Sequence, residues 1–524
     1  MLERRDFLRI VGGVTASGML SPAELLGRRV SHSSTTFAVH PFVEAHPSAV
    51  FIARTSVDTK TNAEKKYQAG YEFGKSVFIE AGSRGIPLSS IVALKPNLTC
   101  RDRSHPQYTI ERSMGIVTDA VFVEGIIESM KSLGMKGSQF YIREVNCHSD
   151  FADGGYLEMA QRTGAGIVFD SSVAEYREVT DGVWFNRIGY FWPVNAAHAF
   201  LINIAKLKTH TMGMTLSAKN LQGTNLPGYH RHCTIYGNSM GVPASDVRSD
   251  ANRVILDNYN RHVADGIPRW DKPGDYGGIR QETWASRCLD NNGATIAGLH
   301  IVEGIYGRDG HFMSGPSPEG LATDYMTNVI LFGKNPFLVD IIGHWLGGHE
   351  PGNFGLFHLA KERGLAETIN PMEIPVYEWI FDGAAILRNL ADFDRTPLKT
   401  LYLRKDYNGQ TEEYWHMVDE PFDYGPVSVR RDGDALPDAT VLQQNYPNPF
   451  NARTTIRYSI PKAGHVRLEV FDITGSQVAV LVDGYHLGGA HLAVWEARIS
   501  ESGVYFYRML FDGFSSTKAM VLLK

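Results

Sequence analysis

Basic and amide side chains gather just after one short apolar run in the middle of the chain. The run covers residues 200–204 and predicts a buried strand. The residues that follow it include Lys206, Lys208, His210, Lys219 and Asn220. Because the loop that leaves the carboxyl end of a strand is the usual ligand site of an open α/β sheet, these donors predict a pocket for an anion, such as a carboxylate, a phosphate or an oxygen-rich cofactor. A solvated basic loop is the alternative, although the apolar residues on both sides argue against full exposure.

Two other predicted strands end in polar side chains. Lys95 and Asn97 follow the apolar run 91–94, and Glu144 lies at the end of the run 140–145. The exits of parallel strands meet at one edge of a sheet, so we expect these residues to converge with the basic group described above. Any one of them alone is better explained as a helix cap or a surface group. Their convergence predicts a single ligand-binding site at that edge.

Carboxylates at four positions are candidate acids, bases or metal ligands. They are Glu144, Glu303, Asp309 and Asp340. Glu303 ends an apolar run, and Asp309 lies in a loop bounded by glycines. Asp340 and His344 are four residues apart in a predicted helix over 337–346, so they share one helix face. This pair suits a metal; equally, a carboxylate near the start of a helix only needs to stabilise the helix dipole.

A histidine-rich segment offers another metal hypothesis. His230, His232 and Cys233 have a spacing that could ligate zinc or another transition metal. A third or fourth ligand cannot be identified by spacing, so the sequence favours surface histidines over a metal site. The four cysteines, which are too far apart for an iron–sulfur motif, are Cys100, Cys147, Cys233 and Cys288. The sequence names no cofactor, and it contains no glycine-rich phosphate motif and no serine-hydrolase motif.

Alternating apolar patterns predict the fold that must position these residues. The predicted strands are 49–53, 91–94, 140–145, 166–170, 200–204 and 329–332, and the predicted helices are 62–81, 118–133, 156–163, 337–346 and 356–364. We expect Thr118 to cap the helix that starts there. The alternation predicts an α/β fold with a mainly parallel sheet flanked by helices, in three layers. The polar, turn-rich segment 252–275 reads as an insertion near the site.

Six strand-like segments after a charged linker predict a second, all-β domain. They are 454–460, 466–471, 478–482, 492–495, 504–510 and 518–523. Val466, Leu468 and Val470 alternate with Arg467 and Glu469, so we expect one face of that strand to be buried. The pattern predicts a small all-β immunoglobulin-like sandwich.

Composition limits the class of protein. The chain has 524 residues, 43% of them hydrophobic and 21% charged, which suits a soluble globular protein of two or three domains. The formal net charge of -6 gives no reason to expect a nucleic-acid partner. We expect a signal segment over 1–30, an α/β domain over 49–430 and the β domain over 438–524.

The amino terminus contains a pattern typical of export. Arg4 and Arg5 are followed by the sequence DFL and then by a mild apolar run over 10–20. This start resembles a twin-arginine signal, which implies export through the inner membrane by the twin-arginine machinery; a chance basic start to an amphipathic helix is the alternative. The apolar run is too short and too rich in glycine for a membrane span, so no transmembrane segment is expected. Because that route carries folded proteins, it also implies a bound metal or cofactor.

Four strings in the central part carry a resemblance to one family. They are VALKPNL at 92–98, INIAKLKTHTMGMTLSAKNLQGT at 202–224, IVEGIYGRDG at 301–310 and NVILFGKNPFLVDIIGHWLGG at 328–348. Together they resemble the signature of the domain-of-unknown-function 362 family, whose biochemistry is poorly defined. The family pattern usually has an aspartate where this chain has Glu303, which leaves the role of that carboxylate open. Some relatives carry an iron–sulfur module, and the cysteine spacing here does not fit one.

The tail carries a second resemblance. Its strings are QNYPNPFNARTTIRYSIP at 444–461, VRLEVFDITGSQVAVLV at 466–482, GVYFYRM at 503–509 and KAMVLLK at 518–524. They resemble the sorting domain that is read by the type IX secretion system. The resemblance implies that this machinery is a partner and that the protein reaches the cell surface or the medium. An ordinary immunoglobulin-like accessory domain is the alternative, and it has the same fold.

These expectations combine into one functional hypothesis and one rival. The hypothesis is an exported protein whose α/β cleft binds an anionic small molecule or a metal-containing cofactor, with redox activity as an option. The predicted ligand contacts are Lys95, Asn97, Lys206, Lys208, His210, Lys219 and Asn220. The rival is a non-catalytic cell-surface protein that captures a ligand in the same cleft. The sequence does not decide whether the protein is an enzyme.

Overall fold

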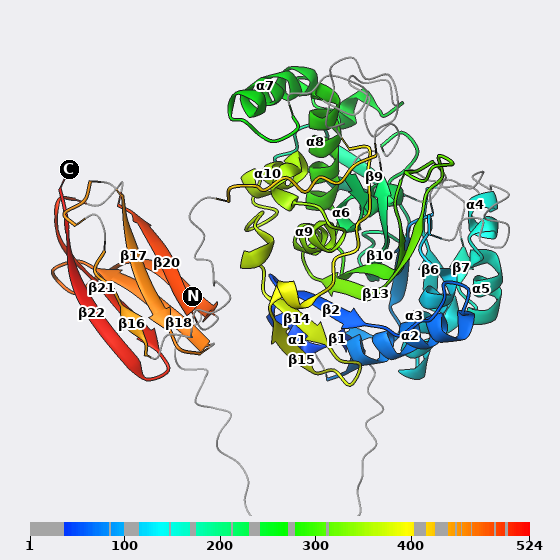
Figure 1. Ribbon diagram of the computed structural model, residues 1–524, viewed down its shortest axis with the longest axis horizontal. Coiled ribbons are helices and arrows are strands. Elements are labelled where there is room, and N and C mark those ends of the chain that lie inside the picture. Colours follow the sequence, from blue (N-terminus) through cyan, green and yellow to red (C-terminus); the bar gives the residue numbers. More distant parts are fainter. Residues whose placement is uncertain are drawn as a thin grey trace, which may run out of the picture. The chain divides into compact units, whose positions relative to one another are not determined.

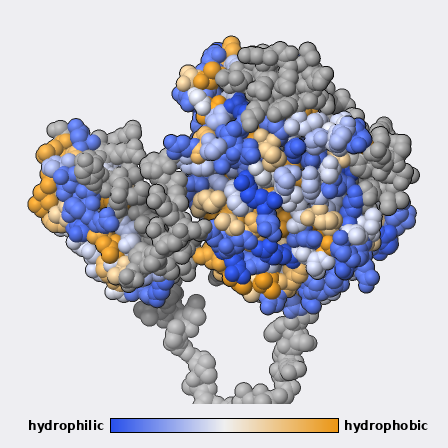
Figure 2. Space-filling view, in the orientation of Figure 1, coloured by the Kyte–Doolittle hydropathy of each residue, from blue (hydrophilic) through white to orange (hydrophobic). Residues whose placement is uncertain are grey.

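The chain forms two compact units, one ending at Phe422 and the other beginning at Asp423. The computed structural model describes residues 36–82, 85–98, 115–145, 148–167, 174–210, 213–229, 241–270, 278–310, 314–402, 415–424, 439–445, 448–451, 453–462, 464–486, 489–497 and 501–523. Within these residues, no helix is long and apolar enough to cross a bilayer. On the face of the molecule shown in Figure 2, hydrophilic residues dominate and hydrophobic ones lie in small groups between them.

The first unit is built on one large mixed sheet (Figure 1). Across the sheet the strands are β15 (Ala385–Arg388), β14 (Val376–Trp379), β2 (Val50–Arg54), β13 (Asp324–Gly333), β12 (Leu299–Arg308), β10 (Ala199–His210), β5 (Ile91–Pro96), β6 (Phe140–Ile142) and β7 (Gly166–Ile167), with β11 (Gly213–Thr215) paired to β10. The run from β12 through β10, β5 and β6 to β7 is parallel throughout. β13 pairs antiparallel with both of its neighbours, and β15 pairs antiparallel with β14. The predicted α/β fold with a mostly parallel sheet is therefore confirmed.

Helices cover both faces of this sheet. One face packs on α2 (Ala63–Val77), α3 (Ala120–Ser132) and α5 (Tyr156–Thr163). The other carries α6 (Ser217–Asn220), α8 (Ile279–Ala294), α9 (Pro336–Leu346) and α10 (Gly355–Glu362), with α7 (Ala251–Ala264) packed on α8. Smaller elements complete the unit: α1 (Pro41–Ala45), α4 (His148–Asp153), a sheet of β1 (Thr36–Val39), β3 (Phe78–Ala81) and β4 (Ile86–Pro87), and a hairpin of β8 (Ala174–Glu178) and β9 (Arg187–Phe191). The three predicted layers are present.

Glycines let α2 and α3 approach each other closely. A Cβ atom at Gly70 would lie 2.1 Å from the carbonyl oxygen of Phe122, and one at Gly125 would lie 2.4 Å from the carbonyl oxygen of Tyr67. Real Cβ atoms do not make contacts this short, so any side chain at either position would force the helices apart. This close pair positions Asp119, the residue on which α3 begins.

The start of α3 differs from the prediction. Asp119 is the cap, because its side chain accepts hydrogen bonds from the backbone N–H groups of Val121 (3.0 Å) and Phe122 (3.4 Å). The hydroxyl of Thr118 instead donates to the carbonyl of Ile204 on β10, at 2.8 Å. Thr118 therefore joins the helix entry to the sheet, and the cap lies one residue later.

Two central segments differ more strongly from the prediction. β10 does not end at Ile204 but runs to His210, so Lys206 and Lys208 lie within a strand and not in a loop after it. The strand continues because β12 pairs with it as far as Lys208 and β11 closes a hairpin on its end. The segment predicted as a turn-rich insertion contains the helix α7, which is polar because it buries few of its residues, among them Ile255 and His262.

The second unit is an all-β sandwich. One sheet has the order β16 (Val441–Leu442), β17 (Arg453–Ile460) and β20 (Gly489–Glu496). The other has the order β19 (Gln477–His486), β18 (Gly464–Phe471), β21 (Gly503–Phe511) and β22 (Phe514–Leu522). All pairings between these strands are antiparallel, and Val466, Leu468 and Val470 are buried in the core as predicted. The prediction of an all-β domain after the α/β unit is confirmed.

Candidate functional site

Lys95, at the end of β5, is fully buried within a polar network. Its ammonium group lies 2.8 Å from a carboxylate oxygen of Glu144. It also donates to the side-chain oxygen of Asn220 at 3.0 Å and to the carbonyl of Pro96 at 2.6 Å. Burial lowers the pKa of Lys95, and the nearby Glu144 opposes that shift. The three acceptors satisfy all three N–H bonds of the ammonium group, so this lysine has no donor left for a ligand.

Asparagine side chains connect this lysine to the neighbouring elements. Asn220 donates to the backbone carbonyl of Lys95 at 3.0 Å and to the side chain of Asn203 on β10 at 2.8 Å. Asn97 donates to the side-chain oxygen of Asn220 at 3.2 Å. Gly223 closes the network, because a Cβ atom there would lie 2.0 Å from an oxygen of Glu144. We call Lys95, Asn97, Glu144, Asn203 and Asn220 the Lys95 cluster.

Lys206 belongs to a second buried cluster. Its ammonium group lies 2.7 and 3.0 Å from the two carboxylate oxygens of Glu303, which is its neighbour on β12, and 3.3 Å from the ring centre of Tyr306. Asp119 joins the cluster through the Tyr306 hydroxyl at 2.9 Å and the ammonium group of Lys66 at 2.6 Å. Burial lowers the pKa of Lys206 and raises the pKa of Glu303. Two cations and two carboxylates balance one another in this Lys206 cluster.

The two clusters lie on opposite faces of the sheet. In β10, Ile202 and Ile204 pack in the core beneath α2 and α3, and Lys206 follows the same alternation. Leu201 packs on the opposite side, and Asn203 follows that alternation toward α6. The exits of neighbouring strands do converge, but the sheet separates the predicted residues into two clusters instead of bringing them into one pocket.

Three of the other predicted residues lie near the end of β10 or β12. Lys208 is buried in β10, and His210 is half-buried at its end, where its backbone carbonyl accepts a hydrogen bond from Thr400 at 2.6 Å. The carboxylate of Asp309 accepts the backbone N–H of Thr323 at 2.6 Å. Burial raises the pKa of Asp309 to about 6. None of these three side chains lines the pocket described next.

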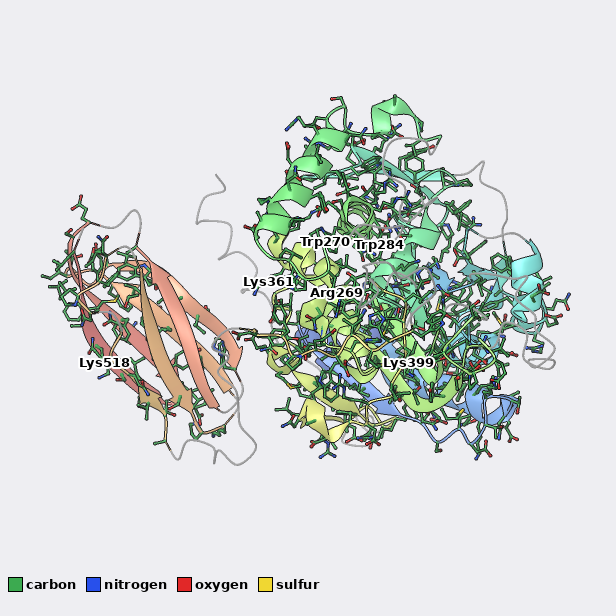
Figure 3. All side chains as sticks on the ribbon, turned by 45° about the horizontal axis from the view of Figure 1, so that its top comes forward. Arg269, Trp270, Trp284, Lys361, Lys399 and Lys518 are labelled. Carbon is green, nitrogen blue, oxygen red and sulfur yellow. The ribbon has the colours of Figure 1, made fainter. Side chains whose placement is uncertain are left out.

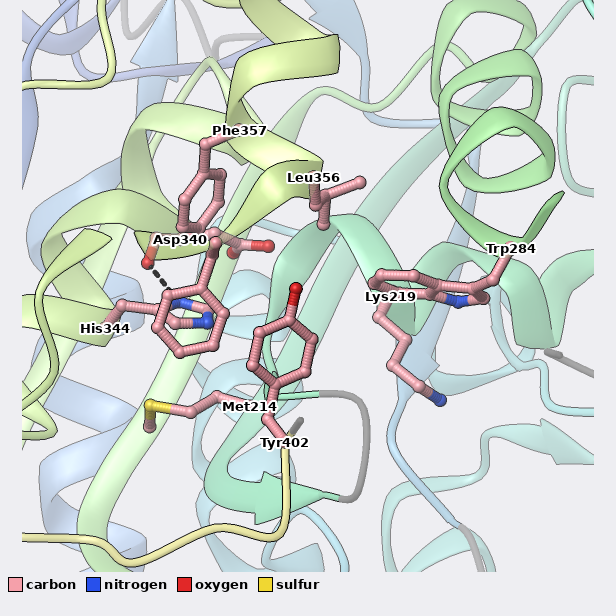
Figure 4. A pocket seen from close by; sticks show the side chains of 9 residues that line it. Met214, Lys219, Trp284, Asp340, His344, Leu356, Phe357 and Tyr402 are labelled. Carbon is pink, nitrogen blue, oxygen red and sulfur yellow. Dashed lines mark hydrogen bonds between the residues drawn. The ribbon is translucent and has the colours of Figure 1, made fainter. Parts of the chain in front are cut away.

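A pocket opens beside α6, on the same face of the sheet as the Lys95 cluster (Figure 4). It is narrow and has room for groups about the size of a water molecule without movement of its walls. Its lining residues are Met214, Lys219, Trp284, Asp340, His344, Phe354, Leu356, Phe357 and Tyr402. Two of the predicted residues, Lys219 and Asp340, therefore meet here, and aromatic side chains form much of the remaining wall.

Asp340 holds α6 in place. Its two carboxylate oxygens accept the backbone N–H groups of Ser217 at 2.7 Å and Ala218 at 2.9 Å, which are the first two residues of α6. Burial raises the pKa of Asp340 to about 8, although these two hydrogen bonds favour the ionised form. Both oxygens are engaged by backbone, so Asp340 anchors the short helix and is poorly placed to act as an acid or base on a ligand.

His344 keeps one ring nitrogen available to the pocket. Its Nδ1 lies 2.8 Å from the backbone carbonyl of Asp340, which can only accept, so Nδ1 carries the proton. Burial lowers the pKa of His344 to about 4, so the ring is neutral at pH 7 and Nε2 is an acceptor. By contrast, both ring nitrogens of the neighbouring His349 are engaged, with the carbonyl of Leu398 and the N–H of Val418.

Lys219 differs from the buried lysines of the two clusters. It is half-buried, and its ammonium group makes no hydrogen bond or ion pair with any residue that the structure describes. In Figure 4 its side chain starts beside Trp284, and its ammonium group points away from His344 and Tyr402. The pocket thus combines one available cation, one neutral histidine acceptor and aromatic walls.

The hypothesis of a metal site receives no support within the described residues. In that part of the chain, no group of three or more His, Cys, Asp or Glu side chains could hold a metal ion. Cys288 is buried in α8. The possible ligands His230, His232 and Cys233 lie outside the described residues, as do Cys100 and Cys147.

Sequence reasoning missed most of the pocket walls. Trp284 lies in α8, a helix whose buried side chains are largely polar, so no apolar period marked it. Met214 lies in the string 202–224, where no spacing distinguished it from its neighbours, and Tyr402 comes from a segment without a recognisable motif. His344 was visible through its spacing from Asp340, but that spacing suggested a metal pair, and the structure instead gives the two residues separate roles.

The family that matches this chain covers part of the first unit. Residues 92–344 match the family model described as Domain of unknown function (DUF362). No curated protein matches the chain. Four chains of solved structures match. One comes from the study described as "Structural and functional probing of PorZ, an essential bacterial surface component of the type-IX secretion system of human oral-microbiomic Porphyromonas gingivalis".

That match is 18% identical and covers 18% of this chain and 12% of the other, with a TM-score of 0.13, which is too low to carry a structural argument. The family match, by contrast, includes β5, β10, α6 and β12 and extends to His344 in α9. Both buried clusters and much of the pocket wall lie largely within it. Residues 92–344, which form much of the α/β unit, are therefore similar to the DUF362 family.

Proposed function

We propose that the α/β unit binds a small anionic molecule, or the anionic group of a cofactor, in the pocket beside Lys219. One observation carries the proposal: Lys219 is a half-buried cation in a pocket with no described partner, whereas Lys95 and Lys206 are neutralised by Glu144 and Glu303. A charge that is partly removed from water without a partner is costly, so an incoming anion is stabilised there.

The pocket walls favour a ligand that is small and partly apolar. Trp284, Phe354, Phe357 and Tyr402 supply aromatic surface, and among the lining residues that the structure describes the only cation is Lys219. Sites of this kind combine apolar walls with a few polar groups that fix the orientation of the ligand. Of the seven predicted ligand contacts, this proposal retains only Lys219. The Lys95 cluster supports α6 through the hydrogen bonds of Asn220 to Lys95 and Asn203.

Thermal melting of the full chain with a small-anion series tests the proposal. Acetate and inorganic phosphate should raise the melting temperature of the wild type, because they bind the folded state only. Lys219→Ala should abolish the shift. Lys361→Ala is the matched control, because it removes the same charge from an exposed position on α10 that is not part of the pocket lining (Figure 3). Equal shifts of the melting temperature in the wild type and Lys219→Ala would contradict anion binding at Lys219.

A metal-containing cofactor with redox activity, and the alternative of a non-catalytic surface binding protein, are separated by a second measurement. Metal analysis and an absorption spectrum of the purified protein decide between them. A bound metal or chromophore would favour the cofactor and an enzymatic role. A colourless, metal-free protein that still binds anions through Lys219 would favour ligand capture without catalysis.

We also propose that the protein is exported through the twin-arginine route and sorted by its β unit through the type IX secretion system to the cell surface or the medium. The proposal rests on Arg4, Arg5 and the sequence strings of the tail. Replacing both arginines by lysine should leave precursor in the cytoplasm. Deleting 438–524 should leave a folded protein in the periplasm, since domains joined by polar linkers fold separately. Normal export or surface delivery of either variant would contradict the corresponding step.

A further inference from the structure

The helix α7 is attached to the first unit through few buried side chains. Of its 14 residues, only Ala251, Ile255 and His262 are buried. In Figure 1 it lies at the outer end of the unit, beside α8. Elements with few buried apolar contacts open locally at a lower cost in free energy than the unit as a whole. The polar contacts of His262 therefore matter for the position of α7.

His262 joins α7 to two neighbouring helices through the two nitrogens of its ring. Nδ1 lies 2.7 Å from a carboxylate oxygen of Glu282 on α8, and Nε2 lies 2.9 Å from a carboxylate oxygen of Glu362 on α10. A carboxylate can only accept, so both nitrogens carry protons and the ring is charged. Although burial opposes this charged form, the two glutamates raise the pKa of His262 above 6.5.

Two other basic groups lie close to His262. Arg261, on the same helix, binds Glu362 at 2.6 Å, and its positive charge slightly opposes that of His262. His358 on α10 is the second, and burial lowers its pKa below 6.5, so it is neutral at pH 7. His262 is therefore the member of this group whose charge changes as the pH rises above 6.5.

Loss of one proton from His262 removes the positive charge that faces Glu282. Nδ1 keeps the remaining proton for this fully buried carboxylate, and Nε2 then turns a lone pair towards Glu362. The indole of Trp270 also donates to Glu282, but it is uncharged, and the second oxygen of Glu282 has no hydrogen-bond partner among the described residues. A buried carboxylate without a facing cation is costly, so an opening of α7 that admits water becomes more favourable.

The helix α10 does not depend on His262 for its position. Five of its eight residues are buried, among them Leu356, Phe357 and Leu359. Arg363, directly after its end, binds Asp290 of α8 at 2.8 Å. We therefore expect α10 to stay in place when the contact between His262 and Glu362 is lost.

We propose that α7 is a pH-dependent latch, which is held on α8 and α10 while both ring nitrogens of His262 carry protons and opens locally when one proton is lost. The inference does not depend on the proposed anion site. The stabilisation of the closed state is fully present below pH 6.5 and is lost as the pH rises through the pKa of His262 in that state. Opening of α7 should therefore increase towards alkaline pH.

Hydrogen exchange of the full chain, followed by mass spectrometry between pH 6 and pH 9, tests the latch. Exchange rates are first corrected for their intrinsic dependence on pH, so that they report protection by structure. Protection of the α7 amides should fall roughly three- to tenfold over this range, as expected for the loss of one partly exposed charged hydrogen bond. Protection of the α10 amides should change by less than about twofold, because that helix stays in place.

Substitutions distinguish titration of His262 from a general loosening of α7. His262→Gln cannot change its charge, so protection of α7 should become independent of pH. Glu362→Gln leaves His262 in place but removes one of its two carboxylates, so the midpoint of the transition should move to lower pH. Asp257→Asn is the matched control, because Asp257 is a carboxylate of α7 that pairs with Arg253, and its loss should leave the midpoint in place.

Each outcome supports or overturns the latch. A fall in protection that is equal in α7 and α10 would show that the whole region loosens, and it would overturn the inference. Protection of α7 that does not vary with pH in the wild type, or that varies in the same way in His262→Gln, would also overturn it. The midpoint in Glu362→Gln gives an answer even if His262→Gln does not fold, since an unmoved midpoint would exclude the contact with Glu362 as the cause.

Discussion

Lys206 and Lys219 lie in one continuous stretch of sequence, yet they differ in burial and in ion pairing. Lys206 is fully buried and bound by both oxygens of Glu303 and by the ring of Tyr306. Lys219 is half-buried in a pocket wall and has no ion-pair partner among the described residues. The difference teaches that a cluster of basic residues in a sequence can mix cations that are paired inside the fold with cations that have no partner among the described residues. Only the position of the carboxylates separates the two kinds.

The largest effect is expected from breaking the Lys206 cluster. Lys206→Ala leaves the carboxylate of Glu303 buried and unpaired, so the free energy of unfolding should fall by about 3–5 kcal/mol, measured by urea denaturation. Lys206→Met combined with Glu303→Leu removes both charges and should recover most of the loss, because buried ion pairs are often replaceable by apolar pairs. A loss below about 1 kcal/mol for the single variant would show that water reaches the cluster.

A smaller loss of stability should follow from crowding the Lys95 cluster, which lies on the other face of the sheet from the Lys206 cluster. In Gly223→Ala the new Cβ would lie 2.0 Å from a Glu144 oxygen and 2.6 Å from the Cε atom of Lys95. Repacking that buried pair should cost about 1–3 kcal/mol in the free energy of unfolding. Gly293→Ala is the control, since its Cβ meets nothing within 4 Å and alanine favours the helix. Similar melting temperatures for both variants would contradict a tightly closed cluster.

A third ion network should make stability depend on pH. Its exposure to solvent is intermediate between that of the buried Lys206 cluster and that of Lys219. His262 on α7 places Nδ1 2.7 Å from Glu282 of α8 and Nε2 2.9 Å from Glu362 of α10, with Arg261 beside it, and Trp270 also donates to Glu282. Both nitrogens face carboxylates, so both carry protons. Although burial opposes the charged form, the two glutamates raise the pKa of His262 above 6.5.

The sign of the pH effect follows from that raised pKa. The stabilisation is fully present below pH 6.5 and is lost as the pH rises through the folded-state pKa. The loss should be roughly 1 kcal/mol, because Glu362 is partly exposed and water can replace one bond. Denaturation at pH 6 and at rising pH, compared between the wild type and His262→Gln, measures it. If the free energy of unfolding depends on pH in the same way in the wild type and in His262→Gln, His262 is not the cause of the pH dependence.

The smallest effect on stability is expected at Lys219. Lys219→Ala removes a cation without a described partner, so the free energy of unfolding should change by less than about 0.5 kcal/mol in the absence of ligand. Comparing the melting temperature of this variant with that of Lys206→Ala tests whether the two lysines differ in their contribution to stability. A drop as large as that of Lys206→Ala would mean that both lysines are structural and that the pocket has no binding cation.

The architecture was largely predictable because it depends on local patterns. The apolar alternation of Val466, Leu468 and Val470 marks a buried strand face, and the helix over Pro336–Leu346 follows from its apolar spacing. β10 was predicted too short because its apolar run ends at Ile204, whereas the strand continues through buried charged residues. A buried charge such as that of Lys206 is tolerated because a carboxylate on a neighbouring strand, Glu303 on β12, pairs with it.

The candidate site was less predictable, for the same reason. The partner of Lys206 is 97 residues away in the sequence, and Lys95 and Glu144 are 49 residues apart. Spacing along the chain does not report such distant pairs, so paired and unpaired lysines look alike. The sequence groups Lys219 with the buried lysines, and its lack of a described partner, which distinguishes it from them, is visible only in three dimensions.

The anchoring of α6 by Asp340 has a mechanical consequence. A helix of four residues cannot hold its own position, so the location of Lys219 is set by the carboxylate that binds the first two N–H groups of α6. Asp340 and His344 lie one turn apart on α9. Since Asn220 at the other end of α6 is hydrogen-bonded to Lys95 and Asn203 of the sheet, α6 is held between α9 and the sheet, and a displacement of α9 would strain those contacts as it shifted the helix.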